Sequence, residues 1–422
     1  MNKEKQKIVP VLRFPEFEND ENWKNEPLGK FADVSKLAGY EFTKHIVYED
    51  EGKIIALRGL NIKNNKLDLK DVKYIDNSEL SKLSRSKLFI DDLMFTYIGT
   101  IGEVALIEEN DKYYLAPNVS RIRLNKEKVI PNFILQYFNT TNFKKVEVAK
   151  YISSSSQPAL TMGNVRKFSI NLPPSKEEQQ KIANCLSSLD NLITAETEKL
   201  DCLKDHKKGL LQQLFPAKGE TKPQFRFSEF KNEGDWEETI LDDVADYANG
   251  KAHEKEISET GKYKVVNSKF ISTDGRVVKF TDSANLKANI GDVLMVLSDI
   301  PNGKAIAKCF YVDKEDTYTV NQRICKITPT DINNKFLFYI QNRNKYFLAF
   351  DDGVKQTNLR KDTVLSFPFL KPKNPKEQQK IANCLSSADD LIQAQKTKIK
   401  NLKDHKKGLM QQLFPNVNEV AK

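Results

Sequence analysis

The sequence predicts an α+β fold in which two mixed α/β domains alternate with two long helices. Three observations predict it: a segment of 39 residues that occurs twice, a seven-residue spacing of apolar side chains within that segment, and short β-type runs in the region that precedes each copy. At 422 residues the chain also exceeds what one hydrophobic core usually serves. Several domains are therefore expected.

The repeat is the clearest feature of the chain. Residues 178–216 and 377–415 share 29 identities in 39 positions, from EQQKIANCLSS at the start to LFP at the end. A shorter match links the segment RFPEF at Arg13–Phe17 to RFSEF at Arg226–Phe230, and a tryptophan follows each. Matches between these segments are few. The duplication predicts a pseudo-twofold internal repeat, with a shared framework and two divergent domains.

The ends of both predicted helices can be located in the sequence. Ser175 and Asn374 occupy N-cap positions, and a glutamate follows three residues later in each copy, which is the capping-box pattern. A proline ends each copy. We therefore predict spacer helices at 175–215 and 374–414, each roughly 60 Å long.

The apolar residues of the two helices follow a heptad pattern, which predicts a coiled coil whose simplest partner for each helix is the other copy. Each helix begins acidic and ends basic. Antiparallel pairing would place opposite charges together, although the same pattern also suits the helix dipole. The predicted helix-pairing seam consists of Ile182, Leu186, Leu189, Ile193, Leu200, Leu203, Leu210 and Leu214 with Ile381, Leu385, Ile392, Ile399, Leu402, Leu409 and Leu413.

The divergent regions, 22–172 and 236–372, are each predicted to be a mixed α/β domain. Short β-type runs such as Lys53–Leu57 and Val293–Leu297 are bounded by Gly, Asn and Asp, and a helix is predicted to begin near Pro131. The remaining parts are an N-terminal segment at 1–21, a polar linker at 217–235 and a C-terminal tail at 415–422.

The charge of the chain indicates a polyanionic partner, but only weakly. The formal net charge is +9, which suits nucleic acid and equally suits solubility. Polar and basic loops in both domains carry side chains that can pair with base edges or phosphates, while an ordinary solvated turn is the alternative for each loop. The candidate DNA-binding residues are Lys63, Asn64, Lys66, Arg85, Lys87, Ser154, Gln157, Asn302, Lys304, Arg323, Lys355, Gln356, Asn358 and Arg360.

Sequence signatures of catalysis and of metal binding are missing. There is no GxxxxGK[ST] phosphate loop, and the four histidines show no metal-ligand spacing. The five cysteines form no CxxC pair and are expected to be small buried hydrophobes. No run approaches the ~20 apolar residues that span a bilayer, and no secretory signal is visible. We therefore predict no catalytic residue, no metal, no membrane contact and a cytoplasmic location.

The order of these motifs resembles the specificity subunits of type I restriction–modification enzymes. The resemblance rests on the RFPEF segment followed by tryptophan, on Gln-x-x-Leu at Gln157 and Gln356 before each helix, and on the EQQKIA…LFP segment, all occurring twice in order. The second copy departs from the pattern at Ser228, where the first has proline.

The resemblance implies a non-catalytic DNA reader with two target recognition domains, 22–172 and 236–372, separated by two long antiparallel conserved helices. Each domain would read one half of a bipartite, asymmetric site, with the helices fixing the gap. The implied partners are double-stranded DNA, two modification (methyltransferase) subunits and two restriction (ATP-dependent translocase and endonuclease) subunits. S-adenosylmethionine, ATP and Mg²⁺ would be bound by those subunits, with no cofactor in this chain.

Two other functional classes are alternatives to a DNA reader. One is a coiled-coil scaffold with two protein-binding domains, which would lack the salt-dependent DNA affinity that phosphate contacts produce. The other is a free-standing nuclease, which needs a metal-binding carboxylate cluster that the sequence does not offer.

Overall fold

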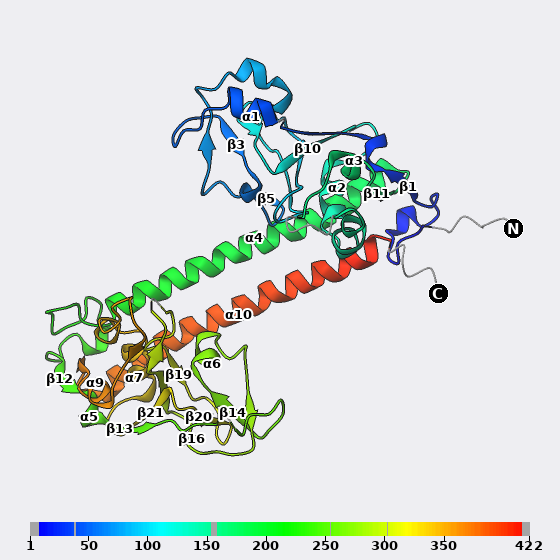
Figure 1. Ribbon diagram of the computed structural model, residues 1–422. Helices are drawn as coiled ribbons and strands as arrows, with labels where there is room; N and C mark the ends of the chain where they lie inside the picture. Colours follow the sequence, from blue (N-terminus) through cyan, green and yellow to red (C-terminus); the bar gives the residue numbers. More distant parts are fainter. Residues whose placement is uncertain (1–7, 38, 153–157, 254, 302, 416–422) are drawn as a thin grey trace. The chain divides into compact units, whose positions relative to one another are not determined.

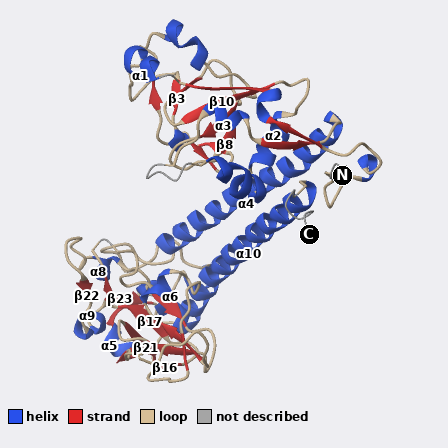
Figure 2. Ribbon diagram, turned by 45° about the vertical axis from the view of Figure 1, so that its right-hand side comes forward, coloured by secondary structure: helices blue, strands red, loops and turns tan. Residues whose placement is uncertain are grey.

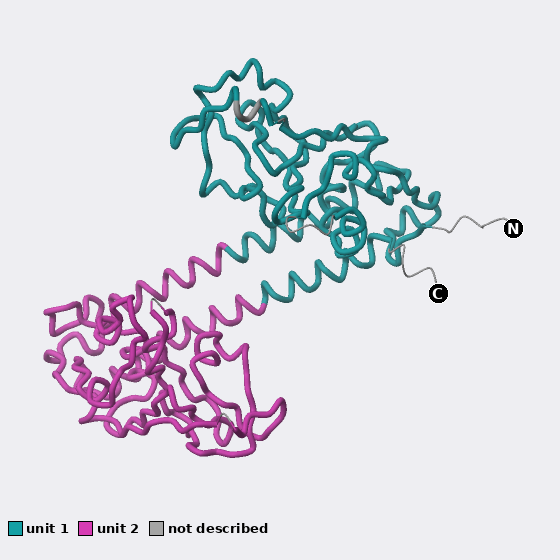
Figure 3. The backbone as a smooth tube through the Cα atoms, viewed as in Figure 1, with its two compact units in different colours: residues 1–197, 398–422 teal, residues 198–397 magenta. Residues whose placement is uncertain are grey.

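The computed structural model describes residues 8–37, 39–152, 158–253, 255–301 and 303–415. The chain forms two compact units, residues 1–197 with 398–422, and residues 198–397 (Figure 3). The division falls within both long helices, α4 (Lys176–Gln213) and α10 (Pro375–Leu413). Each unit therefore contains one mixed α/β domain and a part of each helix.

The long helices begin and end within two residues of the predicted positions. Ser175 Oγ accepts a hydrogen bond from the Glu178 backbone N at 3.1 Å, and Asn374 Oδ1 accepts one from Lys376 N at 3.0 Å. These side chains satisfy amide groups that a helix start leaves without partners. The second half of the predicted capping box is wrong, because the Glu178 carboxylate turns into the protein and binds an arginine.

The first unit is built on a four-stranded antiparallel sheet in the order β2-β10-β7-β8 (Figures 1 and 2). A second sheet, β6-β3-β9, contains the parallel pair β3 and β9, and two small sheets pair β1 with β11 and β4 with β5. The strands are β1 Lys24–Pro27, β2 Ala32–Lys36, β3 Ile55–Leu57, β4 Ile62–Lys63, β5 Lys66–Leu67, β6 Lys73–Tyr74, β7 Leu93–Thr96, β8 Val104–Leu106, β9 Tyr113–Leu115, β10 Val119–Leu124 and β11 Ser169–Leu172. The short helices are α1 Gly39–His45, α2 Pro131–Phe138 and α3 Met162–Arg166.

The second unit repeats this plan with a four-stranded antiparallel sheet in the order β13-β21-β17-β19. A further sheet has the order β15-β14-β20-β16, and the small sheets pair β12 with β23 and β18 with β22. The strands are β12 Glu237–Ile240, β13 Ala245–Asn249, β14 Tyr263–Val266, β15 Phe280–Thr281, β16 Lys287–Ala288, β17 Val293–Val296, β18 Ser298–Asp299, β19 Cys309–Tyr311, β20 Tyr318–Val320, β21 Ile324–Pro329, β22 Thr357–Asn358 and β23 Pro368–Lys371. The helices are α5 Leu241–Val244, α6 Ser268–Ser272, α7 Asn334–Gln341, α8 Lys345–Leu348 and α9 Lys361–Leu365.

The local sequence predictions hold with small corrections. The helix predicted near Pro131 is α2, while the run predicted from Lys53 becomes a strand only at Ile55. All cysteines are free, but only Cys309 and Cys325 are buried, and Cys202 is exposed. The prediction of buried cysteines is therefore confirmed for Cys309 and Cys325 and wrong for Cys202, while Cys185 and Cys384 are half-buried.

In the first unit, α4 and α10 run antiparallel. Ile182 and Leu186 near the start of α4 share a buried cluster with Leu413 at the end of α10. Further along, Lys406 Nζ lies 2.6 Å from Asp190 Oδ2. Residue numbers therefore fall along α10 as they rise along α4, which is the direction that the charge pattern predicts.

The second unit contains the equivalent contacts. Leu214 near the end of α4 packs with Ile381 and Leu385 at the start of α10, and Lys207 Nζ lies 2.6 Å from Asp389 Oδ1. None of the predicted seam residues is exposed. Those that are only half-buried are Leu189, Ile193, Leu200, Leu203, Leu210, Leu402 and Leu409.

A buried ion pair ties the N-terminal segment to the start of α4. Arg13 donates from Nε and Nη2 to the two carboxylate oxygens of Glu178, at 2.8 and 2.7 Å, and Trp23 Nε1 donates to the same carboxylate at 3.1 Å. The side chains of Arg13 and Glu178 are 6% and 1% exposed. The Arg13 Nη1 donates to the Asp20 carbonyl at 3.0 Å, so each of the three guanidinium nitrogens has an acceptor.

The second unit carries a copy of this pair. Arg226 donates to Glu377 at 2.8 and 2.7 Å, and Trp236 Nε1 lies 3.3 Å from the same carboxylate. Because Arg226 belongs to residues 217–235 and Phe230 is also buried, that segment is packed into the unit rather than being a free polar linker. In the part of the chain that the structure describes, no helix has the length and apolar character needed to cross a membrane.

Replacing Glu178 with alanine is expected to lower the free energy of unfolding of the first unit by about 3–5 kcal/mol, because it leaves a buried guanidinium without its partner. Urea denaturation followed by tryptophan fluorescence measures the change. Glu177→Ala, at the exposed neighbouring position, is the matched control and should have a small effect. Equal stability of the two variants would contradict a structural role for the pair.

Candidate nucleic-acid interface

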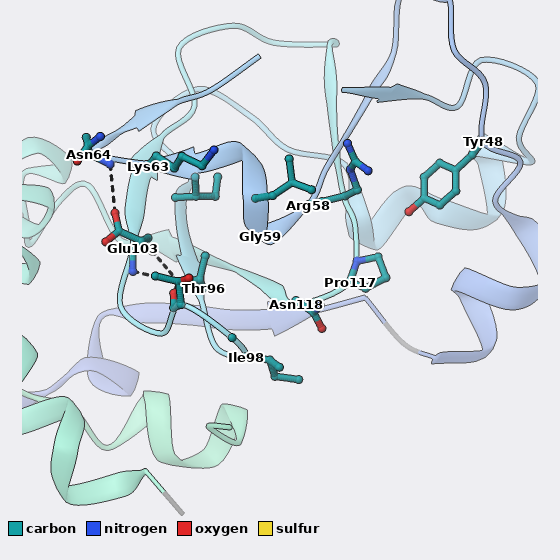
Figure 4. A pocket seen from close by; sticks show the side chains of 14 residues that line it. Tyr48, Arg58, Gly59, Lys63, Asn64, Thr96, Ile98, Glu103, Pro117 and Asn118 are labelled. Atoms are coloured by element: carbon teal, nitrogen blue, oxygen red, sulfur yellow. Dashed lines mark hydrogen bonds between the residues drawn. The ribbon is translucent and has the colours of Figure 1, made fainter. Parts of the chain in front are cut away.

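A pocket of about 790 Å³ opens on the domain of the first unit (Figure 4). It lies where Tyr48, the segment that ends in β4, the turn after β7 and the segment before β10 meet, so its walls come from four separate parts of the sequence. The residues that matter for its chemistry are Tyr48, Arg58, Lys63, Asn64, Thr96, Ile98, Glu103 and Asn118.

The β4–β5 hairpin places two of the predicted residues at this pocket. Asn64 and Asn65 form its two-residue turn, and both have positive φ angles, 52° and 65°. Asparagine tolerates this conformation, and such a turn matches the twist of the flanking strands. Lys63 and Asn64 therefore line the pocket, whereas Lys66 on the far side of the turn donates to Thr194 Oγ1 on α4 at 2.9 Å.

The turn between β7 and β8 closes another side of the pocket. Thr96 Oγ1 donates to the Thr100 carbonyl at 2.5 Å and accepts from the Glu103 backbone N at 2.9 Å. Glu103 Oε2 in turn accepts from the Asn64 backbone N at 3.1 Å, which joins this turn to the hairpin (Figure 4). The segment from Gly99 to Gly102 thus forms a tight turn between β7 and β8.

The pocket presents both donors and acceptors. Arg58 Nη2 donates to Asp71 Oδ1 at 2.8 Å, while its Nε has no partner in the described part of the chain. Partial burial raises the pKa of the Tyr48 phenol, and the charge of Arg58 opposes part of that rise. A mixed set of groups beside the apolar Ile98 suits the edge of a base, because a phosphate offers only acceptors.

A backbone arrangement around the end of the central strand occurs in both units. In the first, Tyr97 N donates to the Asn118 carbonyl at 3.2 Å, and Leu160 N donates to the Tyr97 carbonyl at 2.9 Å. In the second, Leu297 N donates to the Arg323 carbonyl at 2.9 Å, and Leu359 N donates to the Leu297 carbonyl at 2.8 Å. Asn118 and Arg323 therefore occupy equivalent places.

In the second unit the small β18–β22 sheet gathers several of the predicted residues. Asn358 lies in β22 opposite Ser298 of β18. Gln356 Nε2 donates to Ser298 Oγ at 2.7 Å. Since Leu297 precedes Ser298 and contacts Arg323, the structure brings Arg323, Gln356 and Asn358 to one edge of the domain.

The other candidate DNA-binding residues do not lie at one common site. Lys87 lies 2.5 Å from Asp111 Oδ1, and Arg85 lines a separate cleft of the first unit. The side chains of Lys304, Lys355 and Arg360 are exposed, and none of them lines a described cavity. The candidates Ser154, Gln157 and Asn302 lie outside the described residues.

Sequence reasoning missed Tyr48, Arg58, Glu103 and Asn118. Only Asn118 carried a usable signal, because an asparagine before a β-type run often adopts the left-handed conformation, and its φ is 72°. Over the residues that the structure describes, no three His, Cys, Asp or Glu side chains cluster in a way that could hold a metal ion.

Comparison with known proteins gives a consistent family assignment. The family model described as type I restriction modification DNA specificity domain matches residues 20–205 and 233–404. The chain is 24% identical over 384 residues to the putative type I restriction enzyme MjaX specificity subunit of Methanocaldococcus jannaschii, covering 84% of each chain. It is 25% identical over 364 residues to the MjaVIII specificity subunit of the same organism, covering 80% of this chain and 82% of the relative.

Solved structures share the fold at lower sequence identity. The crystal structure of a type I restriction-modification S subunit from M. genitalium aligns with a TM-score of 0.63 and 17% identity, covering 97% of this chain and 99% of that one. A structure described as showing complex assembly and conformational transition of the type I R-M system aligns at 0.54 and 16% identity, covering 93% and 97%.

Replacing Thr96 with valine is expected to lower the free energy of unfolding by about 1–3 kcal/mol, because the buried hydroxyl bridges both ends of the turn. Chemical denaturation measures the loss. Thr100→Val is the control, since Thr100 is exposed and contributes only its backbone carbonyl. If both variants unfold alike, the hydroxyl does not hold the turn.

Proposed function

The chain belongs to the family of type I restriction modification DNA specificity domains, and we propose that, as the specificity subunit of such a system, it reads the two halves of a bipartite, asymmetric DNA site with its two domains. The observation that carries this proposal is the contrast between the units. Their frameworks repeat residue by residue, while equivalent places in their loops differ, as with Asn118 and Arg323. Different side chains at equivalent places suit different half-sites.

In this proposal the chain supplies recognition and its partners supply chemistry. Two modification subunits would methylate adenine with S-adenosylmethionine, and two restriction subunits would cleave DNA with ATP and Mg²⁺. The chain itself would hold none of these cofactors. Its contribution would be to position the methyltransferase active sites over the chosen adenines.

The long helices would act as a spacer, paired as an antiparallel coiled coil with pseudo-twofold symmetry. Contacts within each unit support a rigid junction between domain and helices. In the first unit Asp190 accepts from Lys406 and from Gln136 Nε2 on α2, at 2.6 and 2.8 Å. In the second unit Asp389 accepts from Lys207 and from Tyr339 on α7, at 2.6 and 2.8 Å. A domain held this firmly would transmit a change in helix length to the DNA.

Inserting one heptad into each helix, after Thr197 in α4 and after Thr397 in α10, is expected to widen the gap between the half-sites and to leave both half-site sequences unchanged. A heptad keeps the seam in phase and adds about 10 Å, roughly three base pairs of duplex. The measurement is genome-wide detection of methylated adenine after co-expression with a cognate modification subunit.

A heptad inserted after Gly219 is the matched control, because it lengthens the chain by the same amount in an exposed turn outside the helices. It should leave the gap unchanged. New half-sites with the old gap in the helix variant would overturn the spacer role. Absence of any adenine methylation with the wild-type chain and a cognate subunit would overturn the proposed function.

Identical exposed side chains near the ends of both helices are the best candidates for binding the modification subunits. Asp205, His206 and Lys208 of α4 are exposed and match the exposed Asp404, His405 and Lys407 of α10. Internal packing does not explain why they are the same, whereas two copies of one partner would contact the same side chains in each repeat. Exposed positions of the same helices that differ include Glu198 and Thr397.

Reversing charge at Asp205 alone or at Asp404 alone is expected to reduce the number of bound modification subunits from two to one, and reversing both to abolish binding. Native mass spectrometry of the co-purified complex counts the subunits. Glu198→Lys and Thr397→Lys are the controls and should retain both subunits. A single-site variant that loses both subunits at once would argue against two equivalent sites.

A further inference from the structure

A second hollow of the first unit, with a volume of about 630 Å³, is lined by an unusual number of basic side chains. It lies beside β2 and β10, between α3 and the short helical segment Leu80–Ser86. We call it the arginine cleft. Its basic residues are Lys36, Arg85, Arg121, Arg123 and Arg166.

Carboxylates neutralise only part of this charge. Arg123 binds both oxygens of Asp92, at 2.7 and 2.6 Å, and Arg121 Nη2 lies 2.5 Å from Asp33 Oδ2. Lys36 and Arg85 are exposed and make no ion pair within the described residues. With five cations facing two carboxylates, the cleft retains a net positive charge.

Two buried polar atoms of the cleft lack partners in the described part of the chain. Arg121 is 7% exposed, and its Nε makes no hydrogen bond. The Oγ of Ser35, on the neighbouring strand, is also without a partner. A buried donor without an acceptor is costly, so a ligand or a water that accepts a hydrogen bond from Arg121 Nε would stabilise the site.

The positive charge of the cleft is larger than the charge at the equivalent positions of the second unit. β2 and β10 correspond to β13 and β21, because both pairs are antiparallel and pair five residues in the same register. α3 corresponds to α9, which has the same length and precedes an equivalent strand. Across these positions Lys36, Arg121, Arg123 and Arg166 are replaced by Asn249, Lys326, Thr328 and Leu365. Three of the four cations are therefore absent from the second unit, whereas Met162 of the cleft is replaced there by Lys361, so these positions carry four cations in the first unit and two in the second.

We propose that the arginine cleft binds a phosphate of the DNA backbone, so that the first domain contributes a phosphate contact that the second lacks. The proposal rests on the proposed function. Guanidinium groups offer paired donors in the geometry that a phosphate accepts, and a cleft whose lining contains five cations and one carboxylate, Asp33, suits an acceptor-only ligand. The pocket around Arg58 has a smaller excess of positive charge, since its lining contains two cations, Arg58 and Lys63, and one carboxylate, Glu103.

The test is the double variant Lys36→Gln with Arg85→Gln, at two exposed positions of the cleft. The Lys36 ammonium also lies 5.2 Å from the ring centroid of the buried Tyr97. DNA affinity of the complex with its modification subunits is measured by fluorescence anisotropy as a function of salt, on a duplex with the recognised site and on one without. Each phosphate contact contributes ~0.9 to the slope of log affinity against log salt. The expected result is a slope smaller by about one to two, with a similar loss of affinity for both duplexes.

The matched control is Lys70→Gln with Lys82→Gln, which removes the same charge from exposed positions of the domain outside the cleft. It should leave the slope close to that of wild type. An unchanged slope in the cleft variant, or an equal loss in the control, would overturn the phosphate site. A changed half-site sequence would assign the cleft to base reading and overturn it as well. A wild-type complex without salt-dependent binding would instead overturn the proposed function.

Discussion

The buried contact between arginine and glutamate at the start of each long helix is the constraint on which the framework depends. Arg13 and Arg226 each donate from Nε and Nη2 to the two oxygens of one carboxylate. A tryptophan indole donates to the same carboxylate in each unit. Removing two charges from water costs several kcal/mol per ion, so such a pair is weak evidence for stability alone. Its effect is geometric, because the planar fork allows one orientation between the segment that precedes a domain and the helix that follows it.

Other contacts near this ion pair also occur in both units. Gln179 accepts from the Ile130 backbone N at 2.9 Å, and its copy Gln378 accepts from Asn333 N at 2.9 Å. The aromatic packing repeats too, with the Trp23 and Phe133 ring centroids 5.8 Å apart and those of Trp236 and Phe336 also 5.8 Å apart. The residues that are identical in the two copies thus make contacts inside the framework, whereas the residues that differ lie in the loops. Such a division allows a recognition surface to change without disturbing the parts that orient it.

Most of the correct predictions came from patterns among residues that are close together in the sequence. Helix ends depend on neighbours within a few residues, so Ser175 and the prolines located them closely. The partner of Arg13 could not be predicted in the same way, because Glu178 is 165 residues away and resembled an ordinary capping glutamate. The loops were harder still: Lys66 belongs to a basic loop in the sequence, yet its amine is held by Thr194.

Part of the arginine cleft was predictable from the sequence. Arg121 and Arg123 alternate along one strand, so their side chains emerge on the same face. Two cations on one face of a strand are a recognisable signal. Lys36 and Arg166 could not be added to it, because they reach the cleft from β2 and α3 through sheet pairing that the sequence does not encode locally.

The first unit is discontinuous, since it needs residues 398–422 as well as 1–197. Leu413 and Phe414 belong to the same buried cluster as Trp23 and Phe133. During synthesis, therefore, the domain that leaves the ribosome first waits for the last residues of the chain before its apolar surface is covered. The second unit, which is continuous, can close earlier. A chain that ended before residue 398 would leave this cluster without Leu413 and Phe414.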